Sequence, residues 1–518
     1  MDTKVLRQKI LDLAIRGKLV PQDPNDEPAS VLLERIRQQK QQMVKEGKLK
    51  PKDIKNDSVI FVGEDNLHYE KFADGSVKCI EDEIPFDLPE GWAWERLSNL
   101  ASFSGGKTPS TSRSEYWEGD ILWVTSKDMK SKYITSSQLR LSALGAEQMQ
   151  MYQPDTLLLV TRSGILRHTL PVAILKECAT INQDLKAIIL YMPQLAEYIY
   201  VCLKGMETQL LLKYTKSGTT VENVNFDEFQ KVLLPIPPIQ QIDRIMSSTG
   251  SAESVVSTIE DDKAALADYV VKAKSKILDL AIRGQLVPQD PDDEPASVLL
   301  ERIRAEKEEL IKQGKIKRDK KESFIFRGED NSYYEKIGDK VENISDEIPF
   351  ELPDGWFFVR LKELWKLISG RDLSPSEYNA DGVGIPYITG ASNFVDGKVE
   401  LARWTTSPQV ITEAGDLLLT CKGTIGGMAF NDFGNAHIAR QIMAIRNTFA
   451  LNLEYLALCM RFYINAIKDA AKGLIPGISR EDILNLILPV PSPNYQAKIV
   501  ERVAEVTNIL SAIEKSLN

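Results

Sequence analysis

The sequence has few cysteine and histidine residues. Its five Cys residues form no Cys-x-x-Cys pair, and its three His residues stand in no metal-ligand pattern with them. This excludes the common zinc-binding and disulfide-scaffold classes. Sparse, irregularly spaced cysteine is typical of a reducing cytosol, so we expect a cytoplasmic protein with no bound metal.

Long apolar runs and an excess of positive charge are also missing. No run approaches the roughly 20 apolar residues that cross a bilayer, and the N-terminus has no apolar signal region. We therefore expect a soluble protein with no membrane partner. Lys and Arg number 64 against 74 Asp and Glu, giving a net charge of -10. The total charge thus does not indicate a nucleic-acid partner, and basic groups that contact DNA must be clustered.

Catalytic motifs are absent as well. The sequence contains no Asn-Pro-Pro-aromatic methyltransferase motif, no helicase motif set and no paired-carboxylate nuclease signature. One segment, 101–108, meets a relaxed form of the phosphate-binding loop, but a functional loop needs a buried strand before it and a helix after it. Pro109 follows directly, and the matching segment of the second half reads Ser369-Gly370-Arg371-Asp372. A nucleotide hydrolase therefore stays only as an alternative.

What the sequence does contain is a long amphipathic stretch in its middle, 239–284. Its apolar residues recur at steps of three and four, which predicts one long helix, roughly 65 Å in length, that packs on a partner helix. The two chain ends repeat this stretch in two pieces, so the chain resembles a circular two-fold repeat that is cut inside its second helix. The predicted helix-helix seam comprises Ile242, Ile245, Val256, Ile259, Leu266, Val270, Ile277 and Leu280, then Ile499, Val503, Val506, Leu510 and Ile513, and finally Leu6, Ile10 and Leu13.

The two halves share their frame and differ in what the frame holds. Residues 9–50 recur almost literally at 276–317, and IPFDLPEGW (84–92) recurs as IPFELPDGW (348–356). Gly17 and Gly284 are predicted helix stops. Beyond the Trp of each repeat the sequences diverge into short β-type runs, with helices predicted at 194–213 and 452–471. Matched frames with unmatched domains suggest two different recognition surfaces.

Together these patterns predict an α+β fold. We expect two mixed α/β recognition domains separated by two long antiparallel coiled-coil helical regions in a pseudo-two-fold circular repeat. The predicted segments are a helical frame segment (1–53), a connecting arm (54–92), a first recognition domain (93–233), a central helical region (234–320), a second arm (321–356), a second recognition domain (357–487) and a C-terminal helix (488–518).

This plan resembles the specificity subunit of Type I restriction-modification systems over the whole chain. The residues that carry the resemblance are LPEGW (88–92), LPDGW (352–356), SGTTVENVN (217–225), LPIPPIQQ (234–241) and the repeated ILDLAIRG and VLLERIR segments. The second closing segments, KGLIPGISREDI (472–483) and LPVPSPNYQ (488–496), depart modestly from the usual form.

The resemblance implies a non-catalytic, DNA-recognising role in a bacterial or archaeal cytoplasm. By resemblance, each recognition domain reads one half of a split, asymmetric duplex site. The helices set the gap between half-sites and dock two modification (methyltransferase) subunits, which use S-adenosylmethionine. Restriction (motor-nuclease) subunits that use ATP and Mg²⁺ complete the complex, so no cofactor is expected on this chain.

Candidate DNA contacts lie in loops that differ between the halves and carry cations or amides. Arg and Lys suit guanine or phosphate oxygens, and Asn and Gln suit adenine. The candidates are Lys107, Arg113, Lys127, Lys130, Arg162, Arg167, Asn182 and Gln183 in the first domain, and Arg371, Lys422, Thr424, Arg440 and Gln441 in the second.

Two further expectations complete the sequence reading. The acidic turns at 23–28 and 290–295 are predicted to face solvent or partner subunits, and His168 and His437 are expected to be core or turn histidines, not catalysts. A coiled-coil scaffold that reads no DNA stays open beside the DNA-recognition interpretation.

Overall fold

The computed structural model describes residues 2–55, 57–216, 221–318, 322–395, 397–449, 451–470 and 477–517. The chain divides into two compact units, Met1–Asp262 and Lys263–Asn518, and the boundary falls inside the long helix α8. Segments 217–220 and 472–476 of the two predicted closing motifs lie outside the described residues. No helix among the described residues is long and apolar enough to cross a membrane.

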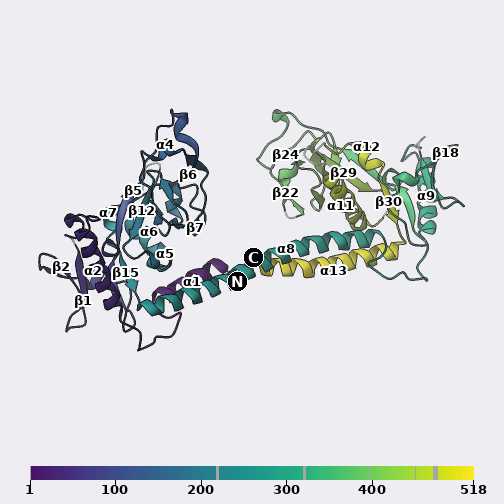
Figure 1. Cartoon of the computed structure of the whole chain (residues 1–518). Helices are drawn as coiled ribbons and strands as arrows, with labels where there is room; N and C mark the ends of the chain where they lie inside the picture. Colours follow the sequence, from purple (N-terminus) through teal and green to yellow (C-terminus); the bar gives the residue numbers. More distant parts are fainter. Residues whose placement is uncertain are drawn as a thin grey trace. The chain divides into compact units, whose positions relative to one another are not determined.

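The first unit combines helices with several small sheets (Figure 1). Its helices are α1 (Thr3–Ile15), α2 (Ala29–Lys45), α3 (Leu97–Leu100), α4 (Ala143–Ala146), α5 (Ala196–Gly205), α6 (Glu207–Tyr214), α7 (Phe226–Phe229) and the first part of α8 (Ile239–Ile282). Its strands are β1 (Ser58–Val62), β2 (His68–Phe72), β3 (Val77–Cys79), β4 (Ala93–Arg96), β5 (Ala101–Gly105), β6 (Trp117–Val124), β7 (Tyr133–Ile134), β8 (Leu139–Leu141), β9 (Leu157–Val160), β10 (Val172–Leu175), β11 (Ala179–Ile181), β12 (Leu185–Leu190), β13 (Thr215–Lys216), β14 (Asn223–Val224) and β15 (Leu233–Ile236).

The second unit repeats this order with different details. Its helices are the last part of α8, α9 (Ala296–Lys312), α10 (Leu361–Leu364), α11 (Leu453–Ala470), α12 (Arg480–Leu484) and α13 (Pro493–Leu517). Its strands are β16 (Ser323–Arg327), β17 (Tyr333–Ile337), β18 (Lys340–Asn343), β19 (Phe357–Arg360), β20 (Trp365–Ser369), β21 (Ile385–Ile388), β22 (Phe394–Val395), β23 (Lys398–Val399), β24 (Trp404–Thr405), β25 (Ile411–Thr412), β26 (Leu417–Thr420), β27 (Met428–Phe430), β28 (Ala436–Ile438), β29 (Ile442–Asn447) and β30 (Ile487–Val490).

Each unit is centred on a mainly antiparallel sheet with an apolar strand, β9 or β26, in its interior; in the first unit the edge strand β7 pairs parallel to β10. The strand order is β5-β12-β9-β10-β7 in the first unit and β20-β29-β26-β27 in the second. All four residues of β9 and of β26 are buried, because a helix covers one face and a second small sheet covers the other. In the first unit α5 packs between β10 and α1, and in the second α11 packs on α13. The mixed α+β class predicted from sequence is confirmed.

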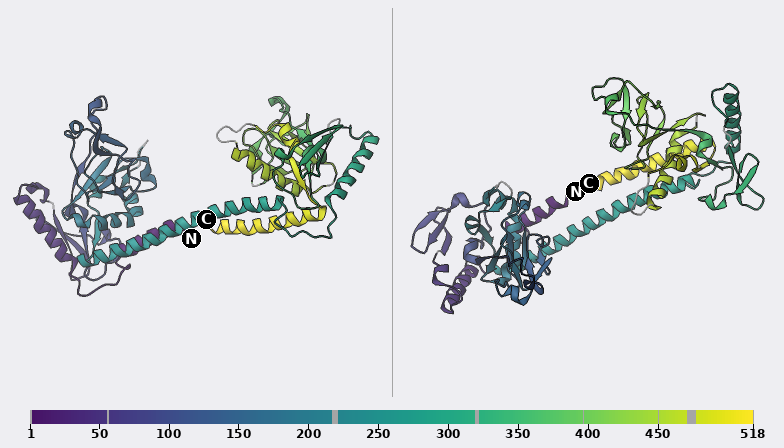
Figure 2. Two further views of the ribbon diagram at one scale, coloured as in Figure 1. Left: turned by 45° about the vertical axis from the view of Figure 1, so that its right-hand side comes forward. Right: turned by 90° about the horizontal axis from the view of Figure 1, so that it is seen from above.

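The long central helix predicted from the 3-4 spacing is confirmed as α8. It ends where predicted, because Gly284 adopts φ +68° and its amide donates to the carbonyl of Ala281 (3.2 Å). In the first unit α1 lies beside α8, and Arg7 bonds Glu253 (2.9 Å) and Glu260 (2.6 Å). In the second unit α13 runs along the last part of α8 in both views of Figure 2, and Lys274 bonds Glu514 (2.6 Å).

The predicted seam residues differ in exposure. Seven are buried, namely Ile10, Ile242, Ile245, Val256, Val270, Ile499 and Val503. Eight are half-buried, namely Leu6, Leu13, Ile259, Ile277, Leu280, Val506, Leu510 and Ile513. Leu266, at 42% exposure, lies open to solvent in this chain.

Two sequence expectations need correction. The acidic turns do not point only outward: Asp26 is paired with Arg244 of α8 and Asp293 with Lys498 of α13 (3.2 Å), so each turn is bound to a frame helix. The helix expected over 194–213 is broken into α5 and α6. At the break, the side-chain amide of Gln8 donates to the carbonyl of Gly205 (2.8 Å), and α1 packs against that glycine.

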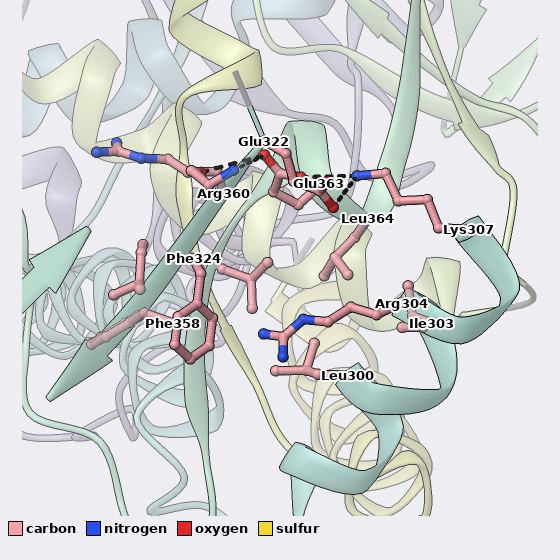
Figure 3. Close-up of a pocket in the computed structure, with 13 residues that line it drawn as sticks. Leu300, Ile303, Arg304, Lys307, Glu322, Phe324, Phe358, Arg360, Glu363 and Leu364 are labelled. Atoms are coloured by element: carbon pink, nitrogen blue, oxygen red, sulfur yellow. Dashed lines mark hydrogen bonds and ion pairs between the residues drawn. The ribbon is translucent and has the colours of Figure 1, made fainter. Parts of the chain in front are cut away.

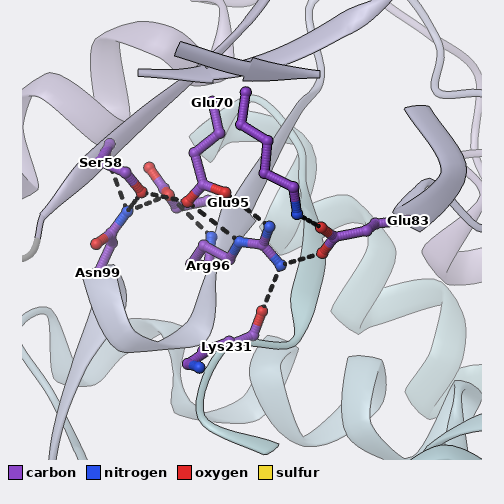
Figure 4. A network of polar contacts seen from close by, with 8 residues as sticks. Ser58, Glu70, Glu83, Glu95, Arg96, Asn99 and Lys231 are labelled. Atoms are coloured by element: carbon purple, nitrogen blue, oxygen red, sulfur yellow. Dashed lines mark hydrogen bonds and ion pairs between the residues drawn. The ribbon is translucent and has the colours of Figure 1, made fainter. Parts of the chain in front are cut away.

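A helix and a three-stranded meander precede β4 and β19, namely α2 with β1–β3 and α9 with β16–β18, and buried charges join them to these strands. Arg96 on β4 bonds Glu70 (2.7 Å) and Glu83 (2.9 Å), and it donates to the carbonyl of Lys231 (2.8 Å) (Figure 4). Arg360 on β19 repeats these contacts with Glu335 (2.7 Å) and Glu347 (2.8 Å).

A buried lysine adds a second contact at the same junction. Lys40 is 1% exposed and bonds Asp57. Lys307, its counterpart, bonds Glu322 (2.9 Å) and Glu363 (3.0 Å) beside a cavity of about 40 Å³ (Figure 3). Such a cavity holds a water or two and is far too small for a nucleotide.

Candidate nucleic-acid interface

Strand order brings several loops of the first unit to one edge of its central sheet. Since β12 is antiparallel to both β5 and β9, the end of β5, the start of β12 and the end of β9 lie at the same edge. The amide of Lys107 donates to the carbonyl of Ile181 (3.0 Å), and that of Thr161 to Asp184 (2.8 Å). We call this set of loops, 106–113, 125–130, 161–168 and 182–184, the strand-end edge of the first unit.

The second unit builds the same edge from different residues. Here the amide of Arg371 donates to the carbonyl of Ile438 (2.9 Å), and that of Cys421 to Gln441 (2.8 Å). Its strand-end edge comprises the loops 370–379, 389–393, 421–427 and 439–441. Burial raises the pKa of the Cys421 thiol, so this side chain stays a neutral thiol behind the loop.

Most of the sequence-predicted residues lie on these two edges and are exposed. Six cations there, Lys107, Lys127, Lys130, Arg162, Arg371 and Lys422, make no ion pair with any residue that the structure describes. The uncharged candidates Gln183, Thr424 and Gln441 are exposed beside them, and Thr108 donates to the side chain of Gln183. Unpaired, solvated cations remain available for phosphate or guanine oxygens.

Besides Gln183, four predicted residues already have partners within the chain. Arg113 donates to the Tyr116 hydroxyl (2.7 Å), Arg167 bonds Glu222 (2.5 Å), and Arg440 bonds Asp372 (2.7 Å). Asn182 is 7% exposed, and its side-chain amide bonds Asp184 inside the turn (3.2 Å). These contacts shape the loops and leave the four residues less free for DNA.

Both edges depend on a glycine that allows two backbones to touch. A Cβ on Gly106 would lie 2.2 Å from the carbonyl oxygens of Ile181 and Asn182, and one on Gly370 would lie 2.1 Å from that of Ala439. Any side chain there would force the loop off the sheet.

Sequence reasoning missed the side chains that close the loops after β6 and β21. Thr125 donates its amide to Asp128 (2.8 Å), and Thr389 donates its amide to Asn393 (3.0 Å). The sequence does carry a signal for these turns: a threonine at matching positions of the two halves, followed three or four residues later by Asp128 or Asn393.

The segment 101–108 is not a phosphate-binding loop. It forms the edge strand β5 and a coil, and residues 106–113, all of them described, contain no helix whose amides could hold phosphate. Among the described residues, no group of three or more His, Cys, Asp or Glu side chains could hold a metal ion.

The two units correspond to two matches of one protein family. Residues 89–252 and again 353–518, more than half of the chain, match the Type I restriction modification DNA specificity domain. The chain belongs to this family. Its role is accordingly DNA recognition as the specificity subunit, without catalysis of its own, while methylation and cleavage are carried out by other subunits.

Relatives and solved structures agree with this assignment. The chain is 25% identical to the EcoEI specificity subunit of Escherichia coli, over 99% of this chain and 90% of that one, and 25% identical to the EcoAI specificity subunit of the same organism, over 97% and 88%. The HsdS subunit of Thermoanaerobacter tengcongensis has a similar fold (TM-score 0.51, 17% identity, 84% of this chain and 93% of that one). So does a chain from a structure on complex assembly and conformational transition of the type I R-M system (TM-score 0.54, 17% identity, 84% and 94%).

Proposed function

We propose that each unit reads one half of a split, asymmetric duplex DNA site through its strand-end edge. The observation that carries this proposal is the gathering of unpaired cations at the same edge of two sheets whose loop sequences differ. Lys107, Lys127 and Arg162 supply positive charge in one unit, and Arg371 and Lys422 supply it in the other. In an acidic chain, such local clusters are what attract phosphates, and the differing loops give each unit its own base preference.

The frame helices α1, α8 and α13 are proposed to act as a spacer and a docking site. Because α8 continues from one unit into the next, its length would fix the gap between the half-sites. The repeated frame offers two equivalent surfaces, which suits two modification subunits on one asymmetric chain. Those subunits would supply S-adenosylmethionine-dependent adenine methylation, and restriction subunits would supply the ATP- and Mg²⁺-dependent steps.

The decisive experiment is single-molecule sequencing of methylated adenines in cells that carry this chain and its methyltransferase partner, with and without this chain. A split motif that depends on this chain supports the proposal. Exchanging 93–215 for the corresponding segment of another family member should change only one half-site. A methylation pattern indifferent to this chain would favour the scaffold alternative.

A further inference from the structure

In the first unit, a ring N–H donates a hydrogen bond to the main-chain carbonyl oxygen of Lys107, a cation of the strand-end edge. The indole Nε1 of Trp123, on β6, donates to the carbonyl of Lys107 (3.2 Å). The amide of Lys107 donates to the carbonyl of Ile181 (3.0 Å), so both backbone groups of Lys107 are bonded to neighbouring strands. Trp123 is 6% exposed, and the edge of Trp117 packs on it with the ring centroids 5.0 Å apart. Trp117 in turn donates to the carbonyl of Ser110 in the same loop (3.2 Å).

The second unit holds the equivalent oxygen with a different residue from a different strand. Arg371 occupies the position of Lys107, since its amide bonds Ile438 as that of Lys107 bonds Ile181. Its carbonyl lies 2.8 Å from Nε2 of His437. In the tautomer in which Nδ1 accepts from the amides of Gln409 (3.3 Å) and Val410 (3.1 Å), Nε2 carries the proton and donates to this carbonyl. His437 is fully buried on β28, as expected of a core histidine. It pairs in register with Tyr387 on β21, and Thr180 on β11 pairs in the same way with Trp123 on β6. The Tyr387 hydroxyl accepts from the amide of Leu373 in the loop (3.2 Å).

The contrast with other tryptophans shows that these bonds are not incidental to packing. The indole nitrogens of Trp94 and Trp365 are also buried, yet neither has a hydrogen-bond partner within the described part of the chain. In both units, by contrast, a ring N–H reaches the carbonyl of an unpaired cation, Lys107 or Arg371. Fixing both backbone groups of a residue fixes the direction of its Cα–Cβ bond, and base reading through a long cationic side chain needs that direction to be constant.

We propose that Trp123 and His437 are positioning residues: their ring N–H groups fix the loops that carry Lys107 and Arg371 and thereby set how strictly each unit reads its half-site. This inference rests on the proposed reading of DNA by the strand-end edges. Trp117 and Tyr387 support the same two loops further along.

The test replaces the donor and keeps an aromatic ring. Trp123→Phe removes the N–H that bonds Lys107, and Trp94→Phe makes the same change where the N–H has no partner. Each full-length chain is produced with its methyltransferase partner, and methylated adenines are sequenced at cognate sites and at sites with one changed base. We expect Trp123→Phe to lower discrimination within one half-site by about fivefold, the effect of losing one hydrogen bond, and to leave the other half-site unchanged.

Further variants make the outcome unambiguous. Tyr387→Phe should lower discrimination within the half-site read by the second unit, and Trp94→Phe should leave discrimination within both half-sites unchanged. If Trp123→Phe does not accumulate, Trp117→Phe decides, because its ring is half-exposed and its N–H bonds the same loop. Discrimination in the Trp123→Phe chain equal to that of Trp94→Phe, with the wild-type motif intact, would overturn the positioning role alone. Absence of any split motif with the wild-type chain would overturn the proposed function and the positioning role together.

Discussion

Two cations at the strand-end edge of the first unit differ in the partners that they already have. Lys107 is exposed and makes no ion pair with a described residue, while Arg167 is neutralised by Glu222 at 2.5 Å. Lys107→Ala in the assembled complex should lower the slope of log K against log salt by about one, because one phosphate contact is lost. Arg167→Ala should lower it less. Binding isotherms at several salt concentrations measure both, and equal slopes for the two variants would speak against this prediction.

The buried Arg96 gives a stability prediction at a single residue. Arg96→Ala leaves Glu70, which is 4% exposed, without its cation, so the free energy of unfolding of the first unit should fall by about 3–5 kcal/mol. Arg35 is a matched control, since its pair with Glu27 (2.8 Å) lies in solvent and its loss should cost under about 1 kcal/mol. Denaturant titration of the two variants compares them directly, and similar losses would show that burial of the pair is unimportant.

Glu95 makes the stability of the first unit depend on pH. Burial raises the pKa of its carboxyl from 4.5 to about 7, against hydrogen bonds from Asn99 and the amide of Arg96 and the nearby charges of Arg37 and Lys40. The folded state therefore holds a proton that the unfolded state releases, and this stabilisation is complete below pH 4.5 and lost as pH rises through about 7. Burial also raises the pKa of Asp57, which acts in the same direction.

The corresponding measurement compares wild type with Glu95→Gln. The free energy of unfolding of wild type should rise relative to that of the variant as the pH falls from about 7 to about 5. Urea titrations across this range give the difference, and parallel curves for the two proteins would contradict the assignment. The second unit has Val359 at the matching strand position, so this dependence belongs to the first unit.

At the scale of elements, the stop of α1 is set by a glycine that touches a tryptophan. Gly17 has φ +64°, and a Cβ there would lie 2.5 Å from Pro89 and 2.9 Å from Trp92. Gly17→Ala should therefore lower the free energy of unfolding by about 2–4 kcal/mol, from backbone strain and overpacking. Gly250→Ala, inside α8 with open space around it, should raise it by about 0.5–1 kcal/mol. Thermal melting would show shifts of opposite sign, and shifts of the same sign would count against the argument.

Elements governed by near neighbours could be read from the sequence, and those governed by distant ones could not. The 3-4 spacing and a terminal glycine were enough for α8, because a helix is made of contacts between residues three and four apart. The break at Gly205 depends on Gln8, almost two hundred residues away, so no local pattern signals it.

The same distinction applies to the candidate site. Residue types and loop positions picked out Lys107 and Arg371, but the gathering of three loops depends on the pairing of β5, β9 and β12, which only the fold decides. The contacts of Trp123 and His437 with the loops could not be predicted, because their partners are main-chain carbonyls, which every residue has.

At the scale of the whole molecule, α8 passes from one unit to the other without a break. Inserting one heptad between 256 and 280 adds about 10 Å of helix, so the gap between half-sites should lengthen by up to about three base pairs while both half-sites keep their sequence. Sequencing of methylated adenines reads the gap directly. A seven-residue insertion in the turn at Gly338, outside the frame helices, should leave it unchanged, and an unaltered gap in both variants would remove α8 as the spacer.

The bond from Trp123 to the carbonyl of Lys107 also bears on how new specificities arise. Every amino acid has the same main-chain carbonyl, so a hydrogen bond to this group forms whichever side chain the residue carries. A substitution at position 107 can therefore replace the chemical group offered to a base while the loop keeps its path. The side chain can thus vary while the backbone that carries it stays fixed. A single nucleotide change in the gene can then give the cell an altered target without any change in the fold of the domain.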